Sequence, residues 1–307
     1  AGNQGMLSIC DALYLLFVEN MTCIIKHNPV RAYNHAWMEQ LFAPLLREGY
    51  FASVLCGIEE SKALLYDDRV DHVHMTGGKA THDAIVWGGS GREKNLLAKP
   101  ITSELGAVTP WVIGPGEWSD AEVEHHAKYF TTVLMNNNGC NCNAPQVLLL
   151  PSDGFPADRF LATVKAIVRA RPHAPPYYPG TASRHAAWLR GLEGVASTEL
   201  VESNVKLPPG RCGPPLPWAF STVPLEAVAS GDSAAAAVRV EAFGPTLAIV
   251  MLPSGDDYWA RAAALCNERL EGTLSCSLIE HPSCALSEAD LAAWRYGLVG
   301  VNVWGGQ

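Results

Sequence analysis

The sequence predicts an α/β protein in which a parallel sheet carries helices on both faces. Short apolar runs alternate with longer amphipathic stretches, which is the pattern of buried parallel strands joined by crossover helices. The chain has 307 residues, of which 48% are hydrophobic and 17% are charged. This length and composition indicate one large or two medium domains with a sizeable buried core.

The first hundred residues carry the alternation most regularly. Apolar residues at helical spacing predict helices over residues 8–19, 30–49, 58–66 and 79–86, the second of them closed by Gly49. Short apolar runs between them predict strands over residues 21–26, 51–57 and 71–75. A domain boundary is expected near residues 95–104, where this series ends.

The second half repeats the alternation less regularly. Strands are expected over residues 109–113, 146–150, 247–252, 272–278 and 299–303, and helices over 120–135, 157–169, 258–268 and 288–294. Between residues 171 and 224 proline and glycine are frequent, as in Pro208-Pro209-Gly210. We therefore expect long irregular loops in that region.

Charge and cysteine usage narrow the class of protein. The chain carries 22 basic and 31 acidic residues without a basic patch, which argues against nucleic acid as a partner. Nine cysteines, an odd number, indicate free thiols in a reducing compartment such as the cytoplasm or the mitochondrial matrix. No targeting segment is visible, and the apolar run 12–18 is too short for membrane insertion.

Two short motifs suggest sites that the spacing does not support. The stretch from Thr76 to Lys79 resembles a phosphate-binding P-loop, but Val73 replaces its first glycine and Ala80 its final Ser or Thr. Cys140 and Cys142 resemble half of a zinc site, but no second pair accompanies them at ligand spacing. We therefore expect neither a P-loop nor a metal centre.

Six further short motifs follow one another in a specific order along nearly the whole chain. They are Asn3, Lys26, Met75-Thr76-Gly77-Gly78, Glu104-Leu105-Gly106-Ala107, Gly139-Cys140-Asn141-Cys142 and Glu241-Ala242-Phe243-Gly244-Pro245. The order and the intervals, 23 residues from Asn3 to Lys26 and 99 from Cys142 to Glu241, resemble those of the aldehyde dehydrogenase superfamily. The closing segment around Asn302 is similar to that family's Val-Asn strand.

The resemblance implies a fold and a domain layout. Residues 1–104 would form part of a Rossmann-like nucleotide-binding domain, incomplete here. Residues 105–243 would form an α/β catalytic thiol domain with irregular loops at 171–224. Residues 244–307 would return to the interface between the catalytic and coenzyme domains. Family chains begin upstream of the Asn3 turn and continue past the Val-Asn strand, so the sequence is expected to lack both ends, as a fragment or a degenerate relative.

The resemblance also implies three catalytic roles. Cys142 would be the nucleophile, because a thiolate is the softest nucleophile that proteins supply; the alternative is a buried structural cysteine. Glu104 would activate the water that hydrolyses the thioester, with a solvated surface glutamate as the alternative. Asn3 would stabilise the oxyanion together with the backbone N–H of Cys142, unless the terminus is frayed. Cys140 stands where the family usually has glutamine.

Six residues would bind the cofactor, NAD or NADP. Lys26 would bind the adenosine ribose, while Thr76, Gly77 and Gly78 would admit the pyrophosphate to a helix N-terminus. Glu241 would bind the nicotinamide ribose and Phe243 would pack near the nicotinamide ring, or serve as a core aromatic. Pro29 replaces the glutamate that favours NAD, which leaves the choice between NAD and NADP open.

The resemblance implies oxidation of a small-molecule aldehyde to a carboxylic acid through a cysteine thiohemiacetal and thioester. Two alternatives stay open: an acyl-CoA or acyl-phosphate reductase that uses the same thiol, and a catalytically silent subunit with a structural role. Gly78 and Pro29 depart from the family pattern and favour the silent subunit. A homo-oligomer, or a place in a larger assembly, is expected in each case.

Overall fold

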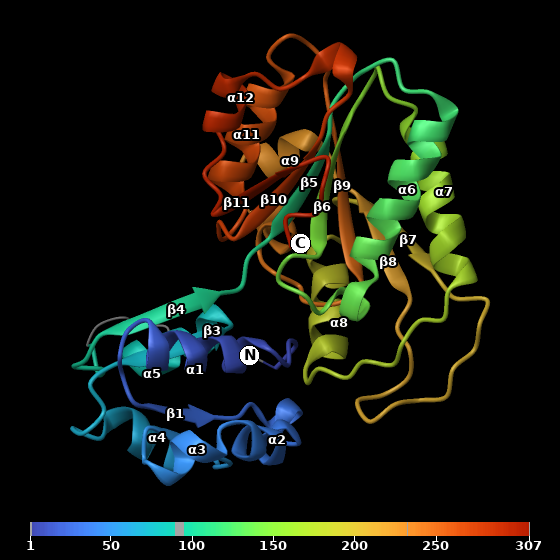
Figure 1. Cartoon of the computed structure of the whole chain (residues 1–307). Coiled ribbons are helices and arrows are strands. Elements are labelled where there is room, and N and C mark those ends of the chain that lie inside the picture. The colour runs from blue at the N-terminus through green and yellow to red at the C-terminus, as the bar shows by residue number, and fades with distance from the viewer. Residues whose placement is uncertain (1, 90–94, 232, 307) are drawn as a thin grey trace. The chain divides into compact units, whose positions relative to one another are not determined.

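The computed structural model describes residues 2–89, 95–231 and 233–306. It divides into two compact units, Ala1–Gly106 and Ala107–Gln307 (Figure 1). The expected α/β class is confirmed, because strands and helices alternate through both units. No helix in the described part of the chain has the length and apolar character needed to cross a membrane.

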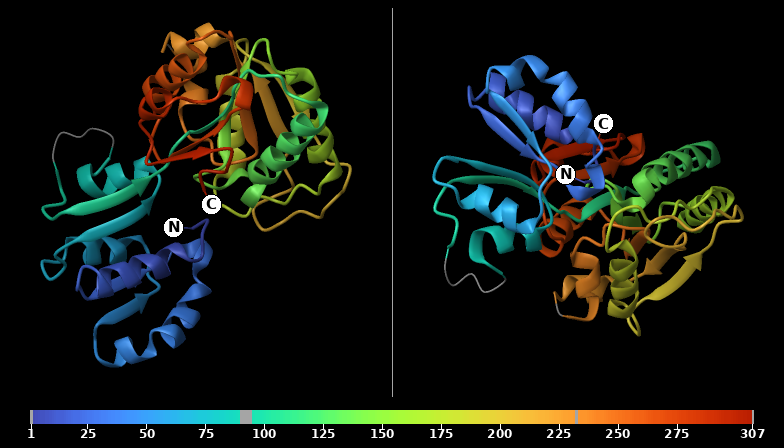
Figure 2. Two further views of the ribbon diagram at one scale, coloured as in Figure 1. Left: turned by 45° about the horizontal axis from the view of Figure 1, so that its top comes forward. Right: turned by 90° about the horizontal axis from the view of Figure 1, so that it is seen from below.

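The first unit contains two separate pairs of parallel strands rather than the single sheet that the alternation suggested. β1 (Cys23–Lys26) pairs with β2 (Phe51–Val54), and β3 (Val73–Gly77) pairs with β4 (Ile101–Leu105) (Figure 2). β4 was missed in the sequence because its Thr, Ser and Glu side chains interrupt any apolar run. Its register places Glu104 beside Thr76 on the neighbouring strand.

The helix expected over residues 30–49 is broken into three pieces. A short 3-10 turn at Pro29–Arg31 is followed by α2 (Asn34–Leu41) and α3 (Ala43–Arg47). Phe42 leaves the helical region with φ −100° and ψ 17°. Pro44 explains the break, because it has no N–H to donate to a carbonyl of the preceding turn.

Helices and strands of this unit share two small cores. α1 (Leu7–Phe17), α2 and the β1–β2 pair bury Ala12, Met38, Phe42 and Phe51, and the last two rings stack with centroids 4.6 Å apart. The β3–β4 pair and α5 (Lys79–Trp87) bury Val73, Val86 and Leu97. α4 (Ile58–Tyr66) connects β2 to β3 and has no buried residue.

The second unit is built on a seven-stranded sheet in the order β11-β10-β5-β6-β9-β8-β7. Its strands are β5 (Thr109–Ile113), β6 (Pro145–Pro151), β7 (Ser197–Val201), β8 (Trp218–Thr222), β9 (Thr246–Leu252), β10 (Ser275–Ile279) and β11 (Leu298–Val301). All neighbouring pairs are parallel except β7 and β8, which are antiparallel. The sheet is therefore mixed, with its one antiparallel strand at an edge.

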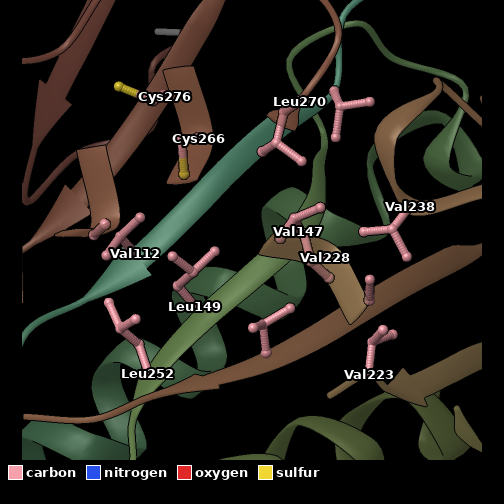
Figure 3. Close-up of a cluster of buried hydrophobic side chains, with 14 of the residues drawn as sticks. Val112, Val147, Leu149, Val223, Val228, Val238, Leu252, Cys266, Leu270 and Cys276 are labelled. Carbon is pink, nitrogen blue, oxygen red and sulfur yellow. The ribbon is translucent and has the colours of Figure 1, made fainter. Parts of the chain in front are cut away.

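Two helical layers cover this sheet. α6 (Asp120–Leu134) and α7 (Ala157–Ala170) pack on the face that carries Leu148 and Leu150. The opposite face carries Val147 and Leu149 (Figure 3) and is covered by α8 (Thr181–Gly191), α9 (Leu225–Ala229), α10 (Ala236–Arg239) and α11 (Tyr258–Arg269). β6 is buried on both sides, which is why its sequence is a continuous apolar run. α12 (Glu288–Ala292) lies against α11.

The expectation of irregular loops over residues 171–224 was wrong for much of that region. It contains α8, β7 and β8, and it buries Trp188, Val201 and Trp218. The many prolines concealed these elements, because they gather in the connections before α8 and before β8 rather than inside them. β7, an edge strand, alternates exposed and buried side chains too weakly to be recognised from sequence.

Candidate functional site

Cys142 lies on a tight turn between α6 and the central strand β6. Asn137, Asn138 and Gly139 adopt left-handed backbone conformations in succession, with φ of 50°, 56° and 72°. Asn and Gly are the residues that tolerate this region best, which explains the Asn-Asn-Asn-Gly sequence before the thiol. The turn reverses the chain direction and delivers Cys142 to the end of the sheet where β6 begins.

Hydrogen bonds from neighbouring strands hold the thiol segment. The hydroxyl of Thr109 donates to the carbonyl of Cys142 at 2.8 Å. The side-chain amide of Asn143 donates to the Cys142 sulfur at 3.8 Å, while its oxygen accepts from the Ser275 hydroxyl at 2.6 Å. The Trp304 indole donates to the Asn143 carbonyl at 2.7 Å. Ser275 therefore fixes which end of the amide faces the half-buried sulfur.

Cys140 has a different environment. Its side chain is fully buried, with the sulfur 3.6 Å from the Thr181 hydroxyl and 3.4 Å from the Phe243 carbonyl. Burial raises the pKa of the Cys140 thiol above its ordinary value, and Thr181 and Arg184 oppose that shift only in part. Of the two cysteines, Cys142 is the partly exposed one, and covalent catalysis requires an accessible thiol.

Glu241 and Phe243 occupy a second turn, between α10 and β9. The Glu241 oxygen Oε1 is enclosed and has no hydrogen-bond partner in the part of the chain that the structure describes. Burial raises the pKa of Glu241 to about 7, although the Ala107 N–H and Arg184 lower it. An enclosed carboxyl oxygen without a donor is costly.

Phe243 is half-buried and its backbone is left-handed, with φ 48°. Its ring meets the Tyr178 ring edge-on, with centroids 5.0 Å apart. It is not among the residues of the two core clusters of the sheet. The contact with Tyr178 holds one edge of the ring while the residue stays partly accessible.

Sequence reasoning missed two residues that support this turn. Gln146 donates to the Ala107 carbonyl at 2.7 Å and accepts from the Ala242 N–H at 3.2 Å, so it joins β5 to the turn. Arg184 on α8 donates to the Ala242 carbonyl at 3.0 Å. The signal for Gln146 was a polar residue in an otherwise apolar strand, whereas Arg184 lay in the region expected to be loops.

The first unit holds the other predicted residues. Asn3 is buried just before α1, and its carbonyl accepts from the Arg31 guanidinium at 2.7 Å, so this segment is tied down rather than frayed. Lys26 is exposed at the end of β1. Thr76 and Glu104 are register partners on β3 and β4.

Gly77 ends β3 and Gly78 is the N-cap of α5. A Cβ atom added at Gly78 would meet nothing within 4 Å. The helix therefore begins beside open space, and the N-terminus of a helix is an arrangement that suits an anionic phosphate. The described residues contain no group of three or more His, Cys, Asp or Glu placed to hold a metal ion.

A family model described as the aldehyde dehydrogenase family matches residues 3–304. The chain belongs to the aldehyde dehydrogenase family. The resemblance inferred from the ordered motifs is thereby confirmed, and so is the fold class. No curated protein matches the sequence.

Several solved aldehyde dehydrogenases share the fold. One from Mycobacterium tuberculosis, complexed with NAD+, is 23% identical with a TM-score of 0.67 and is aligned over 92% of this chain and 55% of its own. An NADP-dependent glyceraldehyde-3-phosphate dehydrogenase from Bacillus halodurans C-125, complexed with NADP, is 18% identical with a TM-score of 0.67. The alignment covers 92% of this chain and 55% of that protein. A gamma-glutamyl-gamma-aminobutyraldehyde dehydrogenase from Burkholderia cenocepacia J2315 is 22% identical with a TM-score of 0.64. The alignment covers 83% of this chain and 49% of that protein. This chain spans about half the length of these family members.

Proposed function

We propose that this chain carries the thiol and cofactor residues of an enzyme that oxidises an aldehyde to a carboxylic acid with NAD or NADP. The observation that carries the proposal is the pairing of two turns in the second unit. One presents the half-buried Cys142, and the other presents Glu241 with an enclosed, unpartnered oxygen. Family membership supports the same chemistry.

Each unit, taken by itself, offers residues suited to one part of a nicotinamide dinucleotide. Glu241 would bind the nicotinamide ribose, and Gly78 leaves open space at the N-terminus of α5 for a pyrophosphate. Lys26 would bind the adenosine ribose, and Phe243 would pack near the nicotinamide. In this proposal the first unit is part of the nucleotide-binding domain and the second unit carries the thiol. When bound, the dinucleotide supplies the acceptor for a hydride.

The protein residues would then act in order. The Cys142 thiolate adds to the aldehyde carbon and forms a thiohemiacetal. The Asn3 amide and the Cys142 N–H stabilise its oxyanion. Loss of hydride from that carbon leaves a thioester. Glu104 takes a proton from water, whose oxygen adds to the thioester carbon; the C–S bond breaks, and the carboxylic acid and the thiolate are released.

The test compares Cys142→Ala with Cys284→Ala, in which a half-buried cysteine outside both turns is removed. Dinucleotide reduction is followed with a panel of aldehydes, and NAD+ and NADP+ binding is measured by calorimetry. We expect Cys142→Ala to abolish turnover and to retain binding, with Cys284→Ala active. Full activity of Cys142→Ala would refute the nucleophile. Absence of dinucleotide binding by the unaltered chain would instead favour a silent structural subunit.

A further inference from the structure

We infer that Arg184 is a positioning residue that holds two turns of the second unit together. The thiol turn is the segment between α6 and β6 (residues 135–144), and the Glu241 turn is the segment between α10 and β9 (residues 240–245). Cys140, Thr181 and Phe243 complete this set of contacts, called the lock below. The contacts stand on the structure alone, whereas their consequence for cofactor binding rests on the proposed function. Arg184 does not touch the reacting atoms in this assignment. Arg184 instead donates hydrogen bonds to backbone carbonyls of the segment that carries Glu241 and Phe243.

Two oxygen atoms are shared between Arg184 and Cys140. The Arg184 nitrogen Nη2 donates to the Thr181 hydroxyl at 3.1 Å and to the Phe243 carbonyl at 3.3 Å. The Cys140 sulfur lies 3.6 Å and 3.4 Å from the same two oxygens. Since the Thr181 hydroxyl donates its own hydrogen to the Tyr178 carbonyl at 2.8 Å, it is free to accept from the guanidinium. The four residues therefore form a closed ring of contacts.

The remaining donors of the guanidinium extend the lock. Nε donates to the Ala242 carbonyl at 3.0 Å and Nη1 to the Pro179 carbonyl at 3.1 Å. The same group lies 5.9 Å from the centroids of the Tyr178 and Phe243 rings. One side chain thus binds two successive carbonyls of the Glu241 turn and the segment that leads into α8. A lysine could not reproduce this, because its single ammonium lacks the planar fork.

The turn needs such support because its conformation is unfavourable by itself. Phe243 has a left-handed backbone with φ 48°, which a bulky side chain rarely adopts. Conformations of this kind persist only where surrounding contacts determine them. The lock also explains why a small buried thiol at position 140 is compatible with the site: Cys140 reaches both shared oxygens from inside the thiol turn.

The charge of Arg184 acts on the same two turns. It lowers the pKa of Glu241 and of Cys140, in each case against the effect of burial. Glu271 opposes it at Glu241 by raising that pKa, and the Ala107 N–H assists it. Removal of the guanidinium would therefore loosen the turn and also disfavour the carboxylate that would accept a ribose hydroxyl.

The experiment uses the full chain with Arg184→Met, Arg184→Lys and, as a matched control, Arg190→Met. Arg190 is an exposed arginine on the same helix. In a Cys142→Ser background, labelling of Cys140 by N-ethylmaleimide is followed by mass spectrometry. We expect labelling at least tenfold faster in Arg184→Met, an intermediate rate in Arg184→Lys, and the parent rate in Arg190→Met. Circular dichroism confirms that each variant is folded; if Arg184→Met is not, Arg184→Lys decides.

A second measurement separates this inference from the proposed function. With Cys142 present, calorimetry should show NAD+ or NADP+ binding at least tenfold weaker in Arg184→Met, and the cofactor KM should rise more than kcat falls. Parent-like labelling of Cys140 in Arg184→Met, or equal acceleration in Arg190→Met, would overturn the lock. Faster labelling in a chain that binds no dinucleotide would uphold the lock and refute the proposed function.

Discussion

Gly139 lies so close to Gly244 that a Cβ atom at position 139 would sit 2.2 Å from the Gly244 carbonyl oxygen. This is the point where the thiol turn and the Glu241 turn meet through their backbones. Position 139 must be glycine-sized for the two backbones to approach, and Gly139 also needs a positive φ of 72°. The motifs around Cys142 and Glu241 are thus parts of one packed structure, although 99 residues separate Cys142 from Glu241.

Gly139→Ala should therefore cost both stability and activity. The added methyl group would have to displace backbone, which no side-chain rotation can relieve, so we expect destabilisation on the order of 3 kcal/mol and loss of turnover. Urea unfolding and dinucleotide reduction measure the two effects. Gly194→Ala is the matched control, since Gly194 has φ 75° but nothing within 4 Å of an added Cβ. It should cost about 1 kcal/mol; equal losses in the two variants would contradict the contact.

Glu241 should make the stability of the chain depend on pH in a defined window. Its pKa is raised from 4.5 to about 7 in the folded state, so the folded state retains the proton when the unfolded state has lost it. Stability is accordingly undiminished below pH 4.5, falls as pH rises to about 7, and is constant above that. The loss is at most about 3 kcal/mol.

Glu241→Gln removes this titration while preserving the side chain's size. The free energy of unfolding is measured by urea unfolding from pH 4 to pH 8. As pH rises from 4.5 to about 7, the parent should lose stability relative to Glu241→Gln. Parallel curves would mean that the carboxyl is better solvated than the structure indicates.

Much of the fold could be predicted from sequence where a single physical rule dominates. Thr109–Ile113 and Ile58–Tyr66 match their predicted bounds, because burial on both faces of β5 and helical periodicity in α4 leave clear patterns. Prediction failed where tertiary context decides. Phe42 breaks a helix because of the proline two residues later, and β4 owes its pairing to β3 rather than to its own polar sequence.

The candidate site shows the same limit. Motif order predicted Cys142, Glu241 and Phe243 as site residues, and the structure brings the turns that carry them together within the second unit. Arg184 carries no motif, and its contacts depend on α8 folding in a proline-rich region. A residue that works by binding backbone carbonyls leaves no pattern in its own sequence neighbourhood.

Ser275→Ala should slow the reaction of Cys142 with iodoacetamide. Without the Ser275 hydroxyl, the Asn143 amide loses the bond that turns its nitrogen toward the sulfur. One hydrogen bond is worth about 1 kcal/mol, which corresponds to roughly a fivefold change in the population of the productive orientation. Ser277→Ala is the control: the same strand carries Ser277, whose hydroxyl accepts from the Gly305 N–H instead. Equal rates in both variants would show that the amide orientation is held by other contacts.

Arg31→Ala should release the segment that carries Asn3. Arg31 donates to the Gly2 carbonyl at 2.9 Å and to the Asn3 carbonyl at 2.7 Å. Removing its side chain leaves both carbonyl oxygens without this hydrogen-bond donor. We expect hydrogen exchange in residues 2–5 to accelerate by about tenfold, and kcat to fall if the Asn3 amide stabilises an oxyanion. Arg47→Ala, an exposed arginine at the end of α3, should leave exchange in that segment unchanged. Faster exchange without a change in kcat would remove Asn3 from the proposed mechanism, because a loosened donor that mattered could not leave the rate intact.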